Sequence, residues 1–317
     1  EPPDGWAEAL AALGGGPFLA PPGMAARGLH GLVTYVTVES GGPLPVAVAA
    51  WVRRRCRLPL AGGHVVAPTL PVCAPGVDRG ALIDTLVAAL RESGAAEVSF
   101  ESFDASWLPG GDPAAAPRRE FVVALDADDE RQLASFGATH RRHCRRGERD
   151  GWKLWEVPES EAAAVLSLAQ REAAGRAAAR GDPFTVHTPR AAGAGEAWGA
   201  GTFAARHDQE LLAVCLLCWA AGRVYYVAGG STPEGYRAGA ATWLHWRLMA
   251  RFAKQGLTAY NLGGTPAGAL EESHPAHGLA RFKLGFGAAS VPCAGIHRAL
   301  RPIHLMLHRL GGRAGGA

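Results

Sequence analysis

The middle of the second half of the chain constrains the fold most strongly. Three apolar segments of strand length follow one another at 202–207, 210–220 and 223–230, with two residues between each and the next. That spacing predicts a meander of three strands. An amphipathic stretch over roughly 237–255 predicts a helix, and a further strand, TAYNLGG, follows it. We therefore expect a mixed α+β unit here.

The rest of the chain repeats this mixture of strands and helices. In the first half we expect strands at 31–38, 45–53, 64–67, 96–103 and 120–125, with helices at 5–13 and just before Gly94. In the second half we expect a strand at 152–157 and a helix at 159–180 before the meander, then a short helix at 277–286, a strand at 291–300 and a helix at 302–310. The irregular stretch 181–201 has a length that is usually functional or mobile. Both halves are mixed α+β units of similar make-up, which predicts a duplicated architecture, although no strict sequence repeat is visible.

Length and composition agree with two domains, which we place at 1–126 and 127–317. The chain has 317 residues, of which 48% are hydrophobic and 19% charged, so two cores can be buried. The net charge of +3 does not mark a nucleic-acid binder by itself, and we expect no contact with DNA.

The cysteines and the apolar segments bear on the compartment. Six dispersed cysteines do not make a disulfide scaffold, which favours a reducing compartment. The first residues lack the pattern of a signal peptide, and the longest apolar run, at 211–221, is shorter than the roughly 20 residues of a membrane span. We expect a soluble, cytoplasmic monomer without integral membrane contact.

An arginine-rich segment, THRRHCRRGERDG, lies at 139–151. On a helix four of its five arginines share one face through i, i+3, i+4 and i+7 spacing; they are Arg142, Arg145, Arg146 and Arg149. Such a stripe repels itself unless it meets phosphates or carboxylates. The alternative is a solvated face partly neutralised by Glu148 and Asp150.

Two glycine-rich segments follow. In AGGSTPEGYRAGAATWLHW, at 228–246, small residues open a helix whose N–H groups can approach an anion, although Gly239 and Ala240 would also permit close helix packing. In HGLARFKLGFG, at 277–287, stands Lys283, one of three lysines among 32 basic residues. It could neutralise a phosphate or an oxyanion; the alternative is an ordinary surface lysine.

Several other sequence patterns do not indicate a metal site or a catalytic motif. Cys215 and Cys218 lie on one strand, where residues i and i+3 face opposite sides, so a shared zinc is not expected. His304 and His308 lack the glutamate of a zincin motif. No P-loop, G-x-S-x-G elbow or dinucleotide fingerprint is present, so hydrolase, NTPase and dehydrogenase activities have no support.

At these segments the chain resembles the Fem-type (FemABX) transferases and their relatives. The run from VYYVAGG to AYNLGG is similar to their second half, GLARFKLGFG resembles their G-x-x-x-F-K-x-x-F-G signature, and THRRHCRRGERDGWKLWEV resembles the segment that opens their second domain. The resemblance covers essentially the whole chain. The Phe-Lys signature is specific for the superfamily, not for the substrate.

The resemblance implies two tandem GNAT-like domains, each with a mixed, mostly antiparallel sheet flanked by helices, and acyl transfer to an amine at their junction. It implies that Phe282 and Lys283 lie by the aminoacyl ester and that the lysine stabilises the transition state. The co-substrate would be aminoacyl-tRNA, without a tightly bound cofactor or metal. The acceptor would be a peptidoglycan precursor or a natural-product intermediate.

The chain also departs from its relatives. It has no coiled-coil heptads. Acetyl-CoA-dependent relatives bind the pyrophosphate with a turn of the pattern Q/R-x-x-G-x-G/A. When this pattern is aligned with the chain, Gly239 and Ala241 occupy the two small positions. Tyr236 occupies the Q/R position, and Arg237 lies one position after it. This half-match argues against acetyl-CoA as the donor.

No cysteine or serine with a base partner is evident, so we expect direct attack of the amine on the acyl carbonyl. The catalytic candidates are Lys283, Phe282 and Tyr226. The substrate-binding candidates are Tyr236, Arg237, Gly239, Asn261, Gly263 and Gly264, and those for tRNA phosphates are Arg142, Arg145, Arg146 and Arg149. A water chain or a carboxylate on the irregular stretch would serve as the general base. The leading hypothesis is a tRNA-dependent aminoacyltransferase, and the alternatives are an acyl-CoA-dependent N-acyltransferase and a non-catalytic GNAT-like binding module.

Overall fold

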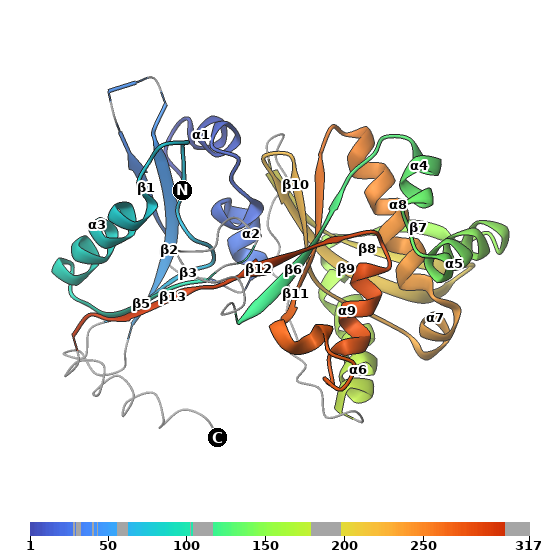
Figure 1. Cartoon of the computed structure of the whole chain (residues 1–317). Coiled ribbons are helices and arrows are strands. Elements are labelled where there is room, and N and C mark those ends of the chain that lie inside the picture. The colour runs from blue at the N-terminus through green and yellow to red at the C-terminus, as the bar shows by residue number, and fades with distance from the viewer. Residues whose placement is uncertain are drawn as a thin grey trace.

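The computed structural model describes residues 1–27, 29, 33–39, 41–42, 44–55, 63–101, 103, 117–178 and 198–301. Within these residues the strands form one six-stranded and one seven-stranded sheet, in two lobes (Figure 1). The helices are α1 (Trp6–Ala12), α2 (Pro21–Ala26), α3 (Arg79–Glu92), α4 (Asp129–Ala134), α5 (Ala138–Arg149), α6 (Glu159–Ala178), α7 (Pro233–Ala238), α8 (Ala240–Lys254) and α9 (His277–Leu284), with 3-10 turns at Pro17–Leu19 and Ala267–Leu270. The strands are β1 (Val33–Val38), β2 (Ala47–Arg55), β3 (Gly63–Ala67), β4 (Val72–Cys73), β5 (Ala95–Phe100), β6 (Arg118–Ala124), β7 (Lys153–Val157), β8 (Trp198–His207), β9 (Glu210–Ala220), β10 (Arg223–Ser231), β11 (Ala259–Pro266), β12 (Ala289–Cys293) and β13 (Ile296–Ala299).

The first sheet has the order β1-β2-β3-β5-β13, with β4 paired to β2. The pair β3–β5 is parallel and the other pairs are antiparallel. Its alternating apolar residues fill two cores, one under α3 and one under α1 and α2. Helix α3 begins at Asp78, whose carboxylate accepts the Ala81 N–H at 3.0 Å and so satisfies a donor of the first turn.

The second sheet has the order β12-β6-β11-β10-β9-β8-β7, in which only β10 and β11, among the described strands, run parallel. Helices α4, α5, α8 and α9 cover one face. The other face carries α6 and, from the first lobe, the 3-10 turn at Pro17–Leu19 and α2, so the apolar core continues between the lobes. The expected fold class, two mixed and mostly antiparallel sheets flanked by helices, is confirmed, and so is the three-stranded meander β8–β10.

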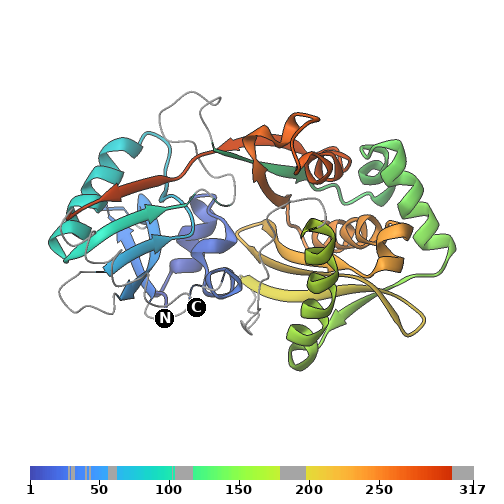
Figure 2. The ribbon, with the colours of Figure 1, turned by 90° about the horizontal axis from the view of Figure 1, so that it is seen from below.

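The two sheets exchange strands across the expected domain boundary. Strand β6, which lies before residue 126, belongs to the second sheet, and β13, near the end of the chain, pairs with β5 in the first (Figure 2). The single strand expected at 291–300 is therefore wrong, because the chain leaves one sheet and enters the other between β12 and β13. Gly295 lies at this crossing, where a Cβ would come within 2.7 Å of the Phe100 carbonyl oxygen. The boundary at 126/127 stays a prediction.

The helix expected over roughly 237–255 is confirmed as α8, which begins a few residues later, at Ala240. Gly239 adopts a left-handed conformation (φ 78°) that ends α7 and begins α8. The expected helix at 302–310, with His304 and His308, and most of the irregular stretch 181–201 lie outside the described residues. None of the helices in the described part of the chain combines the length and apolarity needed to cross a bilayer.

Candidate active site

Lys283 is a buried lysine on α9. Its side chain is 4% exposed, and its Nζ donates a hydrogen bond to the Gly264 carbonyl oxygen at 2.9 Å. The same Nζ lies 5.7 Å from the centre of the Phe121 ring. The alternative of an ordinary surface lysine is therefore wrong. A lysine is almost never buried unless a partner or a function compensates for its desolvation.

Burial also changes the proton affinity of this amine. Desolvation lowers the pKa of Lys283 from 10.5 to about 7, against the attraction of the Glu120 carboxylate, and the Arg118 guanidinium lowers it further. Near pH 7 the amine therefore exists both with and without its proton. Such a group can donate a hydrogen bond to a developing oxyanion and exchange its proton readily.

The Lys283 ammonium lies where two parallel strands part. Strands β10 and β11 pair only over 223–225 and 259–261, although both continue beyond these residues. Gly263, in the left-handed region with φ 74°, follows the last pair. A Cβ at Gly263 would lie 3.2 Å from the Tyr226 carbonyl oxygen and 3.7 Å from Lys283 Nζ. The parting of the strands thus brings backbone atoms and the lysine to one point.

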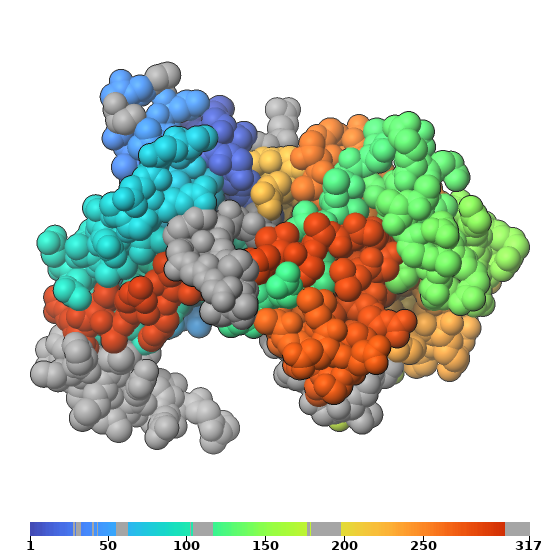
Figure 3. Space-filling view, in the orientation of Figure 1, coloured from blue at the N-terminus to red at the C-terminus, as the bar shows by residue number. Residues whose placement is uncertain are grey.

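Phe282 helps to fix α9 against the rest of the second lobe. Its carbonyl oxygen accepts a hydrogen bond from His140 Nε2 on α5 at 2.9 Å, which places the proton of that imidazole on Nε2. Its ring contacts Phe286 edge to face at 5.2 Å and lies 6.1 Å from the His245 ring. Figure 3 shows the α9–β12 segment in red against the α4–α5 segment in green. These contacts limit the movement of Lys283.

Tyr226 lies behind this aromatic group. Its ring meets His245 edge to face at 4.9 Å, and His245 Nδ1 is 2.8 Å from the Tyr260 hydroxyl. Burial and the neighbouring Cys215 raise the pKa of Tyr226 above its usual value. Burial, and after it the charge of Lys283, lower the pKa of His245 from 6.5 to about 3. The structure shows no direct contact between Tyr226 and Lys283 within the described residues, so a catalytic role for this tyrosine stays a prediction.

A buried carboxylate that the sequence did not indicate stands beside Lys283. Glu120, at 0% exposure on β6, accepts hydrogen bonds from Arg118 Nη2, the Tyr225 hydroxyl and Asn261 Nδ2, each at 2.7 Å. The Asn261 Oδ1 in turn accepts the Gly263 N–H at 2.8 Å. The only signal in the sequence is a charged residue directly before an apolar strand. Of the predicted substrate-binding residues, Asn261, Gly263 and Gly264 belong to this network.

The first lobe closes one side of the network. The Tyr225 ring packs edge to face on Phe18 at 4.4 Å. The Phe103 ring lies between two guanidinium groups, Arg27 at 3.6 Å and Arg118 at 4.1 Å. The site therefore lies at the junction of the lobes, as the resemblance implied.

The predicted phosphate-binding arginines line a groove of about 780 Å³ along α5. Its lining residues are Ala138, Arg141, Arg142, His143, Arg145, Arg146, Arg149 and Arg237. No carboxylate is among them, although three arginines at the rim form ion pairs with Asp150 or Glu234. The structure thus brings Arg237 of α7 beside the stripe on α5. Because His140 and this groove share α5, the groove begins within one helical turn of the contact with Phe282.

Gly239 lies under the same helix. A Cβ there would come within 2.4 Å of the His143 ring, so the imidazole covers the glycine that separates α7 from α8. Tyr236, on α7, is 61% exposed. Of the three, Arg237 lines the arginine groove, and Gly239 lies against His143, which also lines it.

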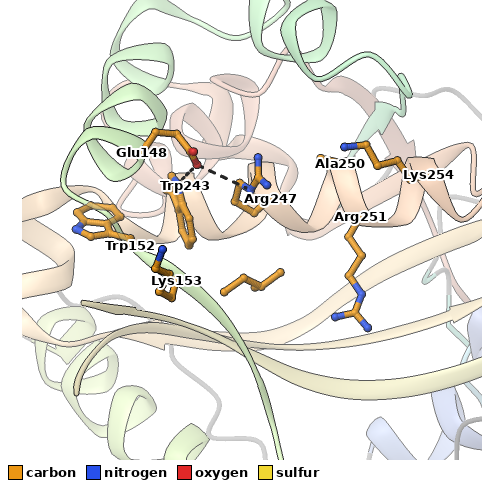
Figure 4. A pocket seen from close by; sticks show the side chains of 9 residues that line it. Glu148, Trp152, Lys153, Trp243, Arg247, Ala250, Arg251 and Lys254 are labelled. Atoms are coloured by element: carbon orange, nitrogen blue, oxygen red, sulfur yellow. Dashed lines mark hydrogen bonds and ion pairs between the residues drawn. The ribbon is translucent and has the colours of Figure 1, made fainter. Parts of the chain in front are cut away.

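A second hollow, of about 430 Å³, lies between α8 and β7 (Figure 4). Glu148 accepts a hydrogen bond from Trp243 Nε1 at 2.8 Å and faces Arg247. The cations Arg251 and Lys254 form ion pairs with Glu156 and Asp129, respectively. Besides the Glu148 carboxylate, four cations line this hollow: Lys153, Arg247, Arg251 and Lys254. Among the described residues, no three histidine, cysteine or acidic side chains are placed to hold a metal ion.

Comparisons with known proteins agree with this description. Residues 134–284 match the family model described as "Acetyltransferase (GNAT) domain". No curated protein matches the sequence.

Several solved structures share the fold over nearly the whole chain. One is the crystal structure of FemX, with a TM-score of 0.67 and 12% identity over 95% of this chain and 98% of that chain. Another is L-PGS from Bacillus licheniformis, with a TM-score of 0.57 and 17% identity over 99% and 98% of the two chains. A third is the C-terminal domain of a putative lysylphosphatidylglycerol synthetase from Agrobacterium fabrum, with a TM-score of 0.51 and 17% identity over 95% and 96%. The resemblance to Fem-type tandem GNAT proteins is thereby confirmed for the fold.

Proposed function

We propose that this chain, an acyltransferase of the GNAT type with a Fem-type tandem fold, transfers an amino acid from aminoacyl-tRNA to an amine and so forms an amide bond. The observation that carries the proposal is the pairing of a buried amine with an arginine groove. Lys283 Nζ lies at the parting of β10 and β11, and a groove lined by six arginines runs along the neighbouring α5.

The reaction needs an activated carbonyl, a neutral attacking amine and a group that receives the developing negative charge. Lys283 supplies that group, since its ammonium already donates to a carbonyl oxygen at 2.9 Å. The attacking amine loses a proton as the carbon–nitrogen bond forms, and the ester oxygen of the donor leaves with one. Phe282 holds the helix that carries Lys283 through its bond to His140 and its contact with Phe286.

The arginine groove supports an RNA donor. Seven cationic or potentially cationic side chains and no carboxylate line it, which complements a run of phosphates. One protein with this fold is named as a putative lysylphosphatidylglycerol synthetase, which supports an aminoacyl group as the transferred unit.

An acyl-CoA donor is the second candidate. The GNAT family match and the glycine at the start of α8 favour it. Against it, His143 lies on Gly239 where the related enzymes approach the pyrophosphate, and Tyr236 stands in the place of a glutamine or arginine.

A transfer assay separates these donors. Charged tRNA with a labelled amino acid and labelled acetyl-CoA would be offered in parallel to a panel of primary amines that includes a peptidoglycan precursor. We expect product from tRNA only, and its loss after RNase treatment. Product from acetyl-CoA alone would select the second candidate, and no product from either donor would reject both.

Charge reversal in the groove tests the role of the arginines. Arg142 and Arg145 form no ion pair among the described residues. Replacing both with glutamate should raise KM for charged tRNA at least 10-fold and reduce the slope of log KM against log salt by about 2. Arg91→Glu, on α3 of the first sheet, is the matched control and should leave KM unchanged.

A further inference from the structure

Burial of the Glu120 carboxylate costs solvation free energy, and hydrogen bonds from neighbouring side chains offset this cost. Its side chain is completely buried, and its two oxygens accept three hydrogen bonds of 2.7 Å from Arg118, Tyr225 and Asn261. A buried carboxylate costs several kcal/mol of solvation unless its oxygens are paired in this way. Packing alone does not need such a group at the junction of two lobes.

A short chain of contacts leads from Glu120 to the ammonium of Lys283. Asn261 Nδ2 donates to Glu120, and Asn261 Oδ1 accepts the N–H of Gly263, so both ends of this amide are fixed. Gly263 turns the backbone with φ 74°, and the register of β11 against β6 shifts between Asn261 and Gly264. The Gly264 carbonyl oxygen at the end of this turn accepts the bond from Lys283 Nζ.

The two glycines are needed for different reasons: Arg118 approaches Gly264 closely, and Gly263 has a φ of 74° that L side chains rarely adopt. A Cβ at Gly264 would lie 2.3 Å from Arg118 Nη2, the atom that donates to Glu120. A Cβ at Gly263 would lie 3.6 Å from the Tyr225 hydroxyl, the second donor to Glu120, and 3.7 Å from Lys283 Nζ. The turn is therefore fitted between the carboxylate network and the lysine.

We propose that Glu120 is a positioning residue for Lys283: through Asn261 it holds the Asn261–Gly264 turn whose last carbonyl receives the ammonium. This role rests on the proposed function, in which Lys283 meets the acyl carbonyl. Glu120 does not touch the substrate, because hydrogen bonds within the protein occupy both of its oxygens. It acts by fixing where the ammonium points and by favouring its charged form.

The first test does not require activity. The chain has only three lysines, Lys153, Lys254 and Lys283, so protein labelled with ¹³C at the lysine Cε gives three signals that can be titrated by NMR. In Glu120→Gln we expect the Lys283 signal to shift and its midpoint to fall by at least half a pH unit. Exposed Lys153 and Lys254 are internal controls and should not move. An unchanged Lys283 titration in a folded variant would overturn the proposal.

The second test uses turnover. We expect Glu120→Gln and Asn261→Ala each to lower kcat at least about 10-fold with little change in KM, since a displacement of about 1 Å can cost up to about 100-fold. Because both residues act through one turn, the factor by which kcat falls in the double variant should be no more than about twice the factor in either single variant. If the two reductions of kcat multiply in the double variant, Glu120 does not act on Lys283 through Asn261. Glu156→Gln is the matched control. It removes an exposed ion pair between Glu156, on β7 of the same sheet, and Arg251, on α8.

The two tests separate the two proposals. If the Lys283 signal moves as expected and no donor gives product, the positioning role stands and the proposed function fails. If product forms but the Lys283 signal does not respond to Glu120→Gln, the positioning role fails and the function stands. If Glu120→Gln does not fold, Asn261→Ala provides both readouts, and an unmoved Lys283 signal there rejects the role of the turn.

Discussion

Replacement of Lys283 by methionine should make the protein more stable, although it removes the proposed catalytic group. Methionine keeps the length and apolar character of the side chain without a charge to desolvate. The pKa of Lys283 is lowered from 10.5 to about 7, which corresponds to about 5 kcal/mol of unfavourable free energy for the charged form at about 1.4 kcal/mol per pKa unit. Loss of the hydrogen bond to Gly264 offsets about 2 kcal/mol of this gain.

The sign of the pH dependence follows from the lowered pKa. The unfavourable term is fully present below the folded pKa near 7 and disappears as the pH rises through the unfolded pKa of 10.5. It amounts to about 4 kcal/mol at pH 7 and about 1 kcal/mol at pH 10. With the lost hydrogen bond, the variant should be about 2 kcal/mol more stable than the natural protein at pH 7 and about 1 kcal/mol less stable at pH 10.

Urea denaturation at pH 7 and pH 10 measures this difference. Free energies of unfolding would be obtained for both proteins from circular dichroism and tryptophan fluorescence, and equal slopes m would show that the same surface unfolds. Lys254→Met, at an exposed lysine on α8, is the matched control and should show no such change between the two pH values. A stability difference between Lys283→Met and the natural protein that is the same at both pH values would refute the argument that Lys283 is buried with a lowered pKa.

Three further predictions follow from the site. If the ammonium of Lys283 is the active form, kcat should fall on the alkaline side with a midpoint near pH 7, and Lys283→Arg should move that limb above about pH 9, because an arginine stays charged; pH–rate profiles that coincide would contradict this. Gly264→Ala should lower kcat at least about 10-fold in a folded protein, because its Cβ would displace the guanidinium of the neighbouring arginine; normal turnover would show that the turn is not needed. His245, with its pKa lowered from 6.5 to about 3, should make the protein sensitive to acid, with about 2 kcal/mol lost between pH 6.5 and pH 5; a stability curve for His245→Phe with the same slope would contradict this.

Local patterns predicted most of the fold. The alternation and short gaps of 202–230 predicted the meander, because they depend on residues close in the sequence. The break at Gly239 and the crossing of the chain at Gly295 were missed. Both arise from close approach to distant segments, His143 and Phe100, which periodicity does not report.

The same distinction applies to the site. Lys283, Asn261, Gly263 and Gly264 lie together as expected, since the signature and the glycine pair mark them. Glu120 and Tyr225 were missed, because their bond joins strands 105 residues apart and nothing in either strand marks it. The burial of Lys283, which decides its chemistry, likewise depends on the packing of α9 against α5 and β6.

Single-turnover transfer from charged tRNA to an amine tests the central claim most directly. The natural protein and Lys283→Ala would be mixed in excess over labelled aminoacyl-tRNA, and the rate of amide formation would be compared. Loss of one oxyanion donor costs about 100-fold or more, so the variant should be at least about 100-fold slower while its circular dichroism spectrum is unchanged. Equal rates for the two proteins would show that the buried lysine does not take part in the reaction.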